Sequence, residues 1–151
     1  MNTTFSYPKW EEIPSINLYL DQVLLYVNQI CPPASPGKEK GLTASMVNNY
    51  VKHGYISKPE KKKYQRKQIA RLIAITTLKS VFSIQEIAQT LNTLHTDTNS
   101  EELYNASVDY MNKDIDPANP IIQASCQTVK LYHQTLAQVY TETPEEEINE
   151  Y

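Results

Sequence analysis

The chain has 151 residues, which favours one domain or a small domain with an appended part and suffices for a core without disulfide bonds. Its 40% apolar and 21% charged residues are typical of a globular protein, and three glycines beside eleven tyrosines favour helices over a turn-rich β-protein. No apolar run approaches the roughly 20 residues of a membrane helix, and the first residues lack a secretory pattern. We therefore expect a cytoplasmic protein, with no membrane association, whose Cys31 and Cys126 are free thiols.

The charge is strongly polarised along the chain. Residues 38–79 carry eleven Lys and Arg against two acids, Glu39 and Glu60, for a net charge of +9. The other three basic and fifteen acidic residues give −12. Concentrated positive charge favours a polyanionic partner, because each neutralised phosphate releases counterions. The alternative, a solvated face that contacts the chain's own acidic part, stays open on charge alone.

A proline-containing opening precedes the first predicted helix. Residues 7–14 hold two prolines and are expected to be irregular. Ser15 is predicted to cap a helix over 16–31, which ends before the proline-rich stretch 32–37, and Trp10 is expected to pack on this helix. The apolar stripe of the helix is Ile16, Leu20, Val23, Leu24, Val27 and Cys31.

A turn, a helix and a basic hairpin are predicted next. The turn is 41–43, with Thr43 as the N-cap of a helix over 44–53 that Gly54 ends. Val47, Tyr50 and Val51 are expected to point inward, which leaves Ser45, Asn48, Asn49 and Lys52 on the opposite side. Tyr55–Ile56 and Lys63–Tyr64 are predicted to be two short extended pieces joined by a basic tip.

Four further helices are predicted. The segment from Gln65 to Leu78 is apolar on most sides and is expected to lie centrally. Ser83 and Glu86 form a capping box for the helix that follows, and 95–99 is predicted to be a loop. Ser100 is predicted to cap the next helix. Asn119 and Pro120 start the last one, before an acidic tail over 142–151.

Catalytic patterns are scarce. The three histidines, His53, His95 and His133, form no metal-ligand spacing with a cysteine or an acid, since Cys126 and His133 lie two helical turns apart. No nucleophile elbow, phosphate-binding loop or zinc-binding histidine pair is present. We therefore expect a protein that is not an enzyme and has no metal or cofactor.

The order of turn, polar helix, basic hairpin, buried helix and capped helix suits the binding of double-stranded DNA. A helix with small polar residues outward can enter the major groove, where asparagine makes bidentate contacts with adenine. Lysines on a neighbouring tip would position the protein on phosphates. Each feature alone is common on solvated surfaces. The residues predicted to face the groove are Thr43, Ser45, Asn48, Asn49 and Lys52, and those predicted to contact phosphates are Lys58, Lys61, Lys62, Lys63 and Arg66.

The stretch from Gly41-Leu42-Thr43 to Ile87 resembles the DNA-binding domain of MerR-type regulators. In that family a Gly-hydrophobic-Ser/Thr turn leads into the recognition helix, and a wing ending in Arg-x-Tyr precedes two more helices. Here Asn49 and Tyr50 stand at the paired tyrosines of the family, and Lys62 stands at the wing arginine before Tyr64, which joins the predicted DNA-binding set. The long dimerisation helix and metal-binding cysteines of MerR proteins are not recognisable here.

The chain as a whole more closely resembles an uncharacterised bacterial domain-of-unknown-function family (1836). The resemblance rests on Trp10-Glu11-Glu12-Ile13-Pro14, on the helix at 18–23 and on the block from Leu42 to Leu72, and it covers roughly residues 7–95. It implies a helix-turn-helix protein without naming a target.

Together these features predict an all-α protein with a MerR-like winged helix-turn-helix, a short basic β-hairpin wing and C-terminal helices. We expect a DNA-binding domain at 10–95 and a helical part at 100–141, which either pairs two copies or covers the core. The predicted function is that of a bacterial transcriptional regulator binding double-stranded DNA. The alternative is an adaptor whose basic face binds an acidic protein partner.

Overall fold

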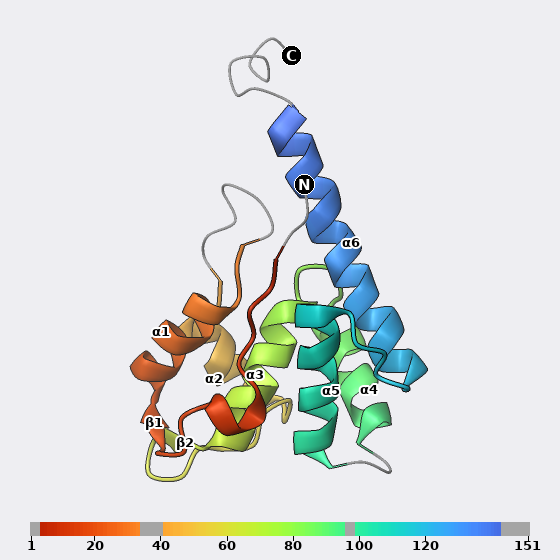
Figure 1. Ribbon diagram of the computed structural model, residues 1–151. Helices are drawn as coiled ribbons and strands as arrows, with labels where there is room; N and C mark the ends of the chain where they lie inside the picture. The colour runs from red at the N-terminus through yellow and green to blue at the C-terminus, as the bar shows by residue number, and fades with distance from the viewer. Residues whose placement is uncertain (1–3, 34–40, 96–98, 143–151) are drawn as a thin grey trace.

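The computed structural model describes residues 4–33, 41–95 and 99–142. The described chain is mostly helical, with one two-stranded sheet, as the composition predicted (Figure 1). The expected proline-rich linker, the loop near 95–99 and the acidic tail fall wholly or partly outside the described residues. The elements are a 3₁₀ turn η1 (Trp10–Glu12), β1 (Leu18–Tyr19), α1 (Leu20–Ile30), α2 (Ala44–Lys52), β2 (Lys63–Tyr64), α3 (Arg66–Leu78), α4 (Ile84–Leu94), α5 (Ser100–Lys113) and α6 (Pro120–Glu142).

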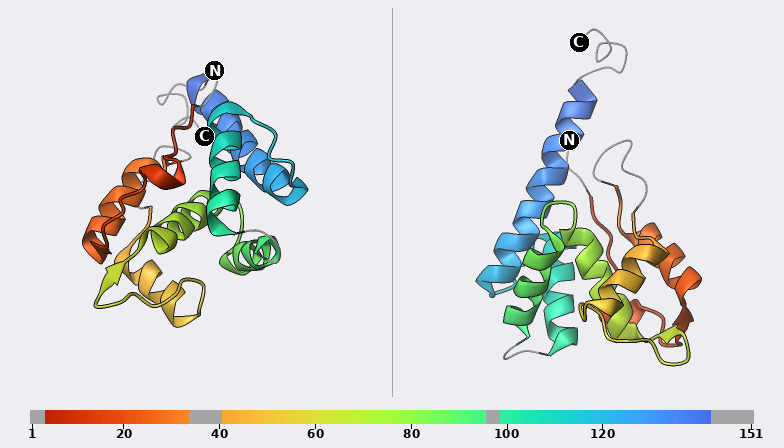
Figure 2. Two further views of the ribbon diagram at one scale, coloured as in Figure 1. Left: turned by 60° about the horizontal axis from the view of Figure 1, so that its bottom comes forward. Right: turned by 180° about the vertical axis from the view of Figure 1, so that it is seen from behind.

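The central element is α3, as its apolar composition predicted. It lies between α1 and α2 on one side and α5 and α6 on the other (Figures 1 and 2). Close packing on both sides leaves few solvent-facing positions, which explains why polar residues on this helix contact other parts of the protein. Its buried residues are Gln68, Ile69, Ala70, Leu72, Ile73, Ile75 and Leu78.

The N-terminal segment runs over α5 and is held there by side chains of that helix. The amide of Asn112 accepts from the Tyr7 N–H and donates to the Tyr7 carbonyl, both at 2.9 Å. Trp10 lies edge-on to the ring of Tyr104, with centroids 6.1 Å apart. The expected packing of Trp10 on the first helix is thus joined by contacts with α5, which bonds the Trp10 N–H through Asn105 and the Pro8 carbonyl through Tyr104.

Several helix ends are where local signals placed them. The Thr43 hydroxyl accepts from the Met46 N–H at 3.2 Å, and Ser83 and Glu86 form the predicted capping box. Asn119 caps α6 ahead of Pro120. For α5 the cap is Asn99, one residue before the predicted Ser100.

The first helix starts later than predicted. It begins at Leu20 rather than Ile16, and Ile16 is 70% exposed. Residues 18 and 19 are extended as β1, and the Gln22 side chain accepts from the Tyr19 N–H at 2.9 Å. Pairing with a distant strand thus overrides the helical period of the sequence.

The two-stranded sheet joins segments far apart in the sequence. β1 pairs antiparallel with β2, so that Leu18 faces Tyr64 and Tyr19 faces Lys63. The predicted pairing of 55–56 with 63–64 is wrong, because Ile56 is buried just after α2 and the Tyr55 carbonyl is held by α3. The hairpin at this place is instead a tight turn over 60–63.

The last helix has a buried face and several exposed apolar residues. Ile122, Cys126 and Val129 are buried, whereas Leu131, Val139 and Tyr140 are exposed. The C-terminal half of α6 extends beyond the rest of the fold (Figure 1).

Cys31 and Cys126 are free thiols, and burial raises the pKa of Cys126 to about 11. Within the described residues, no helix has the length and apolar character needed to span a membrane.

Candidate nucleic-acid interface

The outer face of α2 is polar and open to solvent. Val47 and Tyr50 are buried one turn apart and hold the helix on the core. Helical spacing then turns the remaining side chains outward, as predicted. The exposed side chains of this face are those of Ser45, Asn48, Asn49 and Lys52.

The turn that leads into α2 is fixed by one side chain of α1. The Asn28 amide donates to the Leu42 carbonyl at 2.9 Å and accepts from the Leu42 N–H at 2.8 Å. Gly41 precedes this contact with φ +56°, and a Cβ there would lie 2.3 Å from Asn28 Oδ1. Only glycine fits this position, because both the backbone conformation and the close approach exclude a side chain. Asn28 thus sets where α2 begins.

The segment between α2 and β2 is held by two polar side chains of α3. Arg71 Nε donates to the Tyr55 carbonyl at 2.6 Å. Gln68, which is buried, donates to the carbonyls of Ser57 and Lys58 at 2.9 and 3.2 Å. These contacts satisfy backbone acceptors that no strand partner satisfies, and so they hold an irregular segment in one conformation. Sequence reasoning missed both residues, although polar side chains within an apolar helix were the signal available.

A strained turn carries the basic tip. Lys61 and Lys62 have φ of 51° and 65°, and the backbone groups of Glu60 and Lys63 bond across the turn at 3.2 and 2.9 Å. Positive φ at both central positions is the type I′ pattern, which favours Asn-Gly. A lysine there costs roughly 1–2 kcal/mol. Strained residues of this kind concentrate at functional sites, and both lysine side chains are exposed.

The other predicted DNA-binding residues differ in accessibility. Lys58 is exposed, while Lys63 is half-buried, with its Nζ 4.9 Å from the ring centroid of Tyr19. Arg66 is half-buried and donates from Nε to the Ile13 carbonyl at 3.0 Å. Tyr64 is 3% exposed, so its side chain belongs to the core and cannot reach a partner at the surface. Burial also raises the pKa of Tyr64.

The face formed by α2 and the segment 55–63 has an excess of positive charge. Residues 44–63 hold five lysines and a single acid, Glu60. Among the described residues the ion pairs are Lys9–Asp109, at 2.9 Å, and Lys130–Asp114, both outside this range. Lys52 of α2 and the lysines of the basic turn are therefore without an ion pair among the described residues. Figure 2 (left) shows the segment after α2 running beside that helix to β2.

No metal centre accompanies this face. Over residues 4–33, 41–95 and 99–142, no group of three or more His, Cys, Asp or Glu is placed to hold an ion. Burial lowers the pKa of Arg71, which is half-buried and remains a cation at neutral pH.

The fold and this face define a class: a small helical protein that presents a polar helix beside a rigid basic segment. Residues 8–113 match the family described as Domain of unknown function (DUF1836), and the chain belongs to this family. The match includes α5 but not α6. No curated protein matches the chain, and no solved structure matches it.

Proposed function

We propose that this protein binds double-stranded DNA in a sequence-specific manner and acts, without enzymatic activity, as a transcriptional regulator. In this proposal α2 enters the major groove, and the basic turn at 60–63 lies along the flanking phosphates. The observation that carries the proposal is the exposed polar face of α2 beside a rigid segment whose lysines have no acidic partner among the described residues.

The chemistry of α2 supports base recognition. An α-helix fits the major groove, and the side-chain amides of Asn48 and Asn49 offer the donor and acceptor pair that reads adenine. The Thr43 hydroxyl accepts from the Met46 N–H, so its proton is free to reach a phosphate or a base edge. Fixing of the preceding turn by Asn28 supports a defined approach of the helix to the groove.

The order of elements supports the resemblance to MerR-type regulators. In this proposal α1, the turn at 41–43 and α2 correspond to the first helix, the turn and the recognition helix, and α3 and α4 follow a basic turn that corresponds to the wing. The strand β2 of this turn pairs with β1 ahead of α1, which ties the turn to the helix-turn-helix unit. We propose that the exposed apolar residues of α6, Leu131, Val139 and Tyr140, pair two copies of the chain.

Fluorescence anisotropy with a labelled random duplex tests the proposal. If Lys58, Lys61, Lys62, Lys63 and Arg66 each neutralise one phosphate, affinity should fall roughly 500-fold between about 50 and 200 mM salt. Replacing Lys61, Lys62 and Lys63 with glutamate should abolish binding and leave the helical circular dichroism unchanged.

A matched pair of single variants controls for net charge. Lys62→Glu and Lys113→Glu change the same charge at an exposed lysine, but Lys113 lies at the end of α5. We expect Lys62→Glu to weaken binding at least tenfold and Lys113→Glu to leave it unchanged. Equal losses would contradict the placement of the interface, and no binding at low salt would remove the proposal. Selection from a random library should then yield one motif, and a lack of enrichment would refute sequence specificity.

A further inference from the structure

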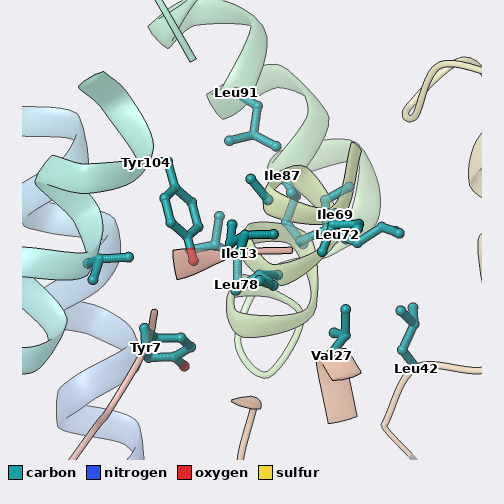
Figure 3. Close-up of a cluster of buried hydrophobic side chains, with 14 of the residues drawn as sticks. Tyr7, Ile13, Val27, Leu42, Ile69, Leu72, Leu78, Ile87, Leu91 and Tyr104 are labelled. Carbon is teal, nitrogen blue, oxygen red and sulfur yellow. The ribbon is translucent and has the colours of Figure 1, made fainter. Parts of the chain in front are cut away.

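A second site lies on the opposite side of α3 from the polar face of α2. A cavity of about 340 Å³ opens between α3, α4, α5 and α6. Figure 3 shows Leu91 of α4 and Tyr104 of α5 extending from their helices toward this region. The deeper walls are apolar and buried, and include Leu91, Leu103, Val108 and Met111.

Four hydroxyls of the wall differ from its two cations in how they are already bonded. The hydroxyls of Thr77, Thr90, Ser107 and Ser125 each donate to a carbonyl of their own helix, at 2.8 to 2.9 Å. Their protons are therefore already used within the protein. The cations Lys67 and Arg71 differ. Within the described part of the chain, Arg71 donates from Nε to the Tyr55 carbonyl, which leaves its terminal nitrogens available, and Lys67 has no ion pair.

The cationic groups of the wall gather at one end. Lys67 and His95 are exposed, so this end reaches the surface. Burial and the nearby charges of Arg71 and Lys67 lower the pKa of His95, which places the three groups in one electrostatic neighbourhood. No aspartate or glutamate is among the described residues that line the cavity. An apolar body with positive charge at its mouth is complementary to a molecule with an apolar body and an anionic head.

We propose that this cavity binds an amphipathic monocarboxylate, with the carboxylate at Lys67 and Arg71 and the apolar body between α4 and α5. If each non-hydrogen atom of a ligand with its hydrogens takes roughly 30 Å³, the volume of a water molecule, the cavity holds about eleven such atoms. This size suits a medium-chain fatty acid or a bicyclic aromatic acid. The guanidinium of Arg71 has a planar fork of donors that matches a carboxylate. The proposal does not depend on DNA binding.

Titration with decanoate, below the concentration at which it forms micelles, tests the site. Trp10 is the single tryptophan of the chain and lines the cavity, so its fluorescence reports on occupancy. We expect a saturable change in Trp10 fluorescence and a rise in melting temperature. Decylamine, with the same chain and the opposite charge, should give neither. Equal effects of the two probes, or no saturable change with decanoate, would overturn the proposal.

Variants separate the charged end from the apolar walls. Lys67→Gln and Arg71→Gln should each weaken decanoate binding at least fivefold, and the Lys67 variant leaves the contact between Arg71 and Tyr55 intact. Lys58→Gln removes an exposed charge from the segment after α2, outside the cavity wall, and should leave decanoate binding unchanged. Ala74→Phe, which fills the cavity, should abolish binding with the circular dichroism spectrum preserved. Unaltered binding in Lys67→Gln and Ala74→Phe, or an equal loss in Lys58→Gln, would refute this site.

Discussion

Two asparagines hold the backbone in the same way on opposite sides of α3. Asn28 bonds both backbone groups of Leu42, and Asn112 bonds both backbone groups of Tyr7, all at 2.8 to 2.9 Å. The segments that they hold differ. Asn28 fixes the start of α2, whose outer face is polar and exposed. Asn112 fixes a segment in which Phe5 and Tyr7 are buried. The same pair of hydrogen bonds thus fixes an exposed helix on one side of α3 and a buried segment on the other.

Charge separates the two sides further. Residues 41–63 carry five lysines against one acid, while residues 99–141 carry five acids against Lys113 and Lys130. Lys130 is itself neutralised, because it bonds Asp114 and the Tyr110 carbonyl. Among the described residues, positive charge without an ion pair is therefore concentrated on the side that Asn28 organises. The comparison shows that one central helix separates a face with excess positive charge from a mostly apolar half.

The largest effect is expected from removing buried side-chain atoms of α3, the helix that both sides share. The Ile73 side chain is buried and lines the cavity, and its carbonyl accepts from Cys31 at the end of α1. Ile73→Ala should lower the free energy of unfolding by about 2–5 kcal/mol. Urea unfolding followed by Trp10 fluorescence and by circular dichroism should show one coincident transition. Separate transitions would mean that the two sides fold independently.

The asparagines provide the most direct comparison. Asn28→Ala and Asn112→Ala each remove two hydrogen bonds and leave backbone groups without partners, at a cost of about 1–3 kcal/mol. Both should lower the urea midpoint. Only Asn28→Ala should also weaken duplex binding, because it alters the turn into α2. A similar loss of affinity in Asn112→Ala would show that affinity follows overall stability rather than the local turn.

Relieving the strain in the turn at 60–63 should stabilise the protein and weaken DNA binding. Replacing Lys61 with Asn and Lys62 with Gly introduces the pair that a type I′ turn favours, and should raise the free energy of unfolding by about 1 kcal/mol. The same variant removes two exposed cations and should weaken DNA binding. The melting temperature and anisotropy measured on one preparation check both effects. A variant that is less stable than the parent would contradict the assignment of strain to this turn.

The smallest effect concerns pH and the side held by Asn112. His133 is buried against Phe5, with ring centroids 5.3 Å apart, and burial lowers its pKa. As the pH decreases, His133 is protonated near pH 6.5 in the unfolded chain and only at lower pH in the folded protein. The contribution of His133 to the free energy of unfolding is therefore fully present above pH 6.5, and it is lost as the pH falls toward the lowered pKa. His133→Gln should flatten the dependence of the urea midpoint between pH 7 and pH 5. An unchanged slope would assign the effect to other groups.

The sequence alone determined the local features of the candidate interface. The cap at Thr43, the end of α2 at Gly54 and the outward set Ser45, Asn48, Asn49 and Lys52 follow from contacts within one or two helical turns. The capping box of α4 and the start of α6 were predictable for the same reason. Such signals act between residues close in the chain, so a single sequence contains them in full.

Only the tertiary structure decided what meets across the fold. It paired Lys63–Tyr64 with Leu18–Tyr19 instead of with 55–56, buried Tyr64, and used Asn28, Gln68 and Arg71 to hold backbone far away in the chain. It also placed Lys67 and Arg71 at the mouth of a cavity formed by four helices. These contacts depend on which buried faces pack together and on which backbone groups are left without a partner. No local pattern of residues specifies either.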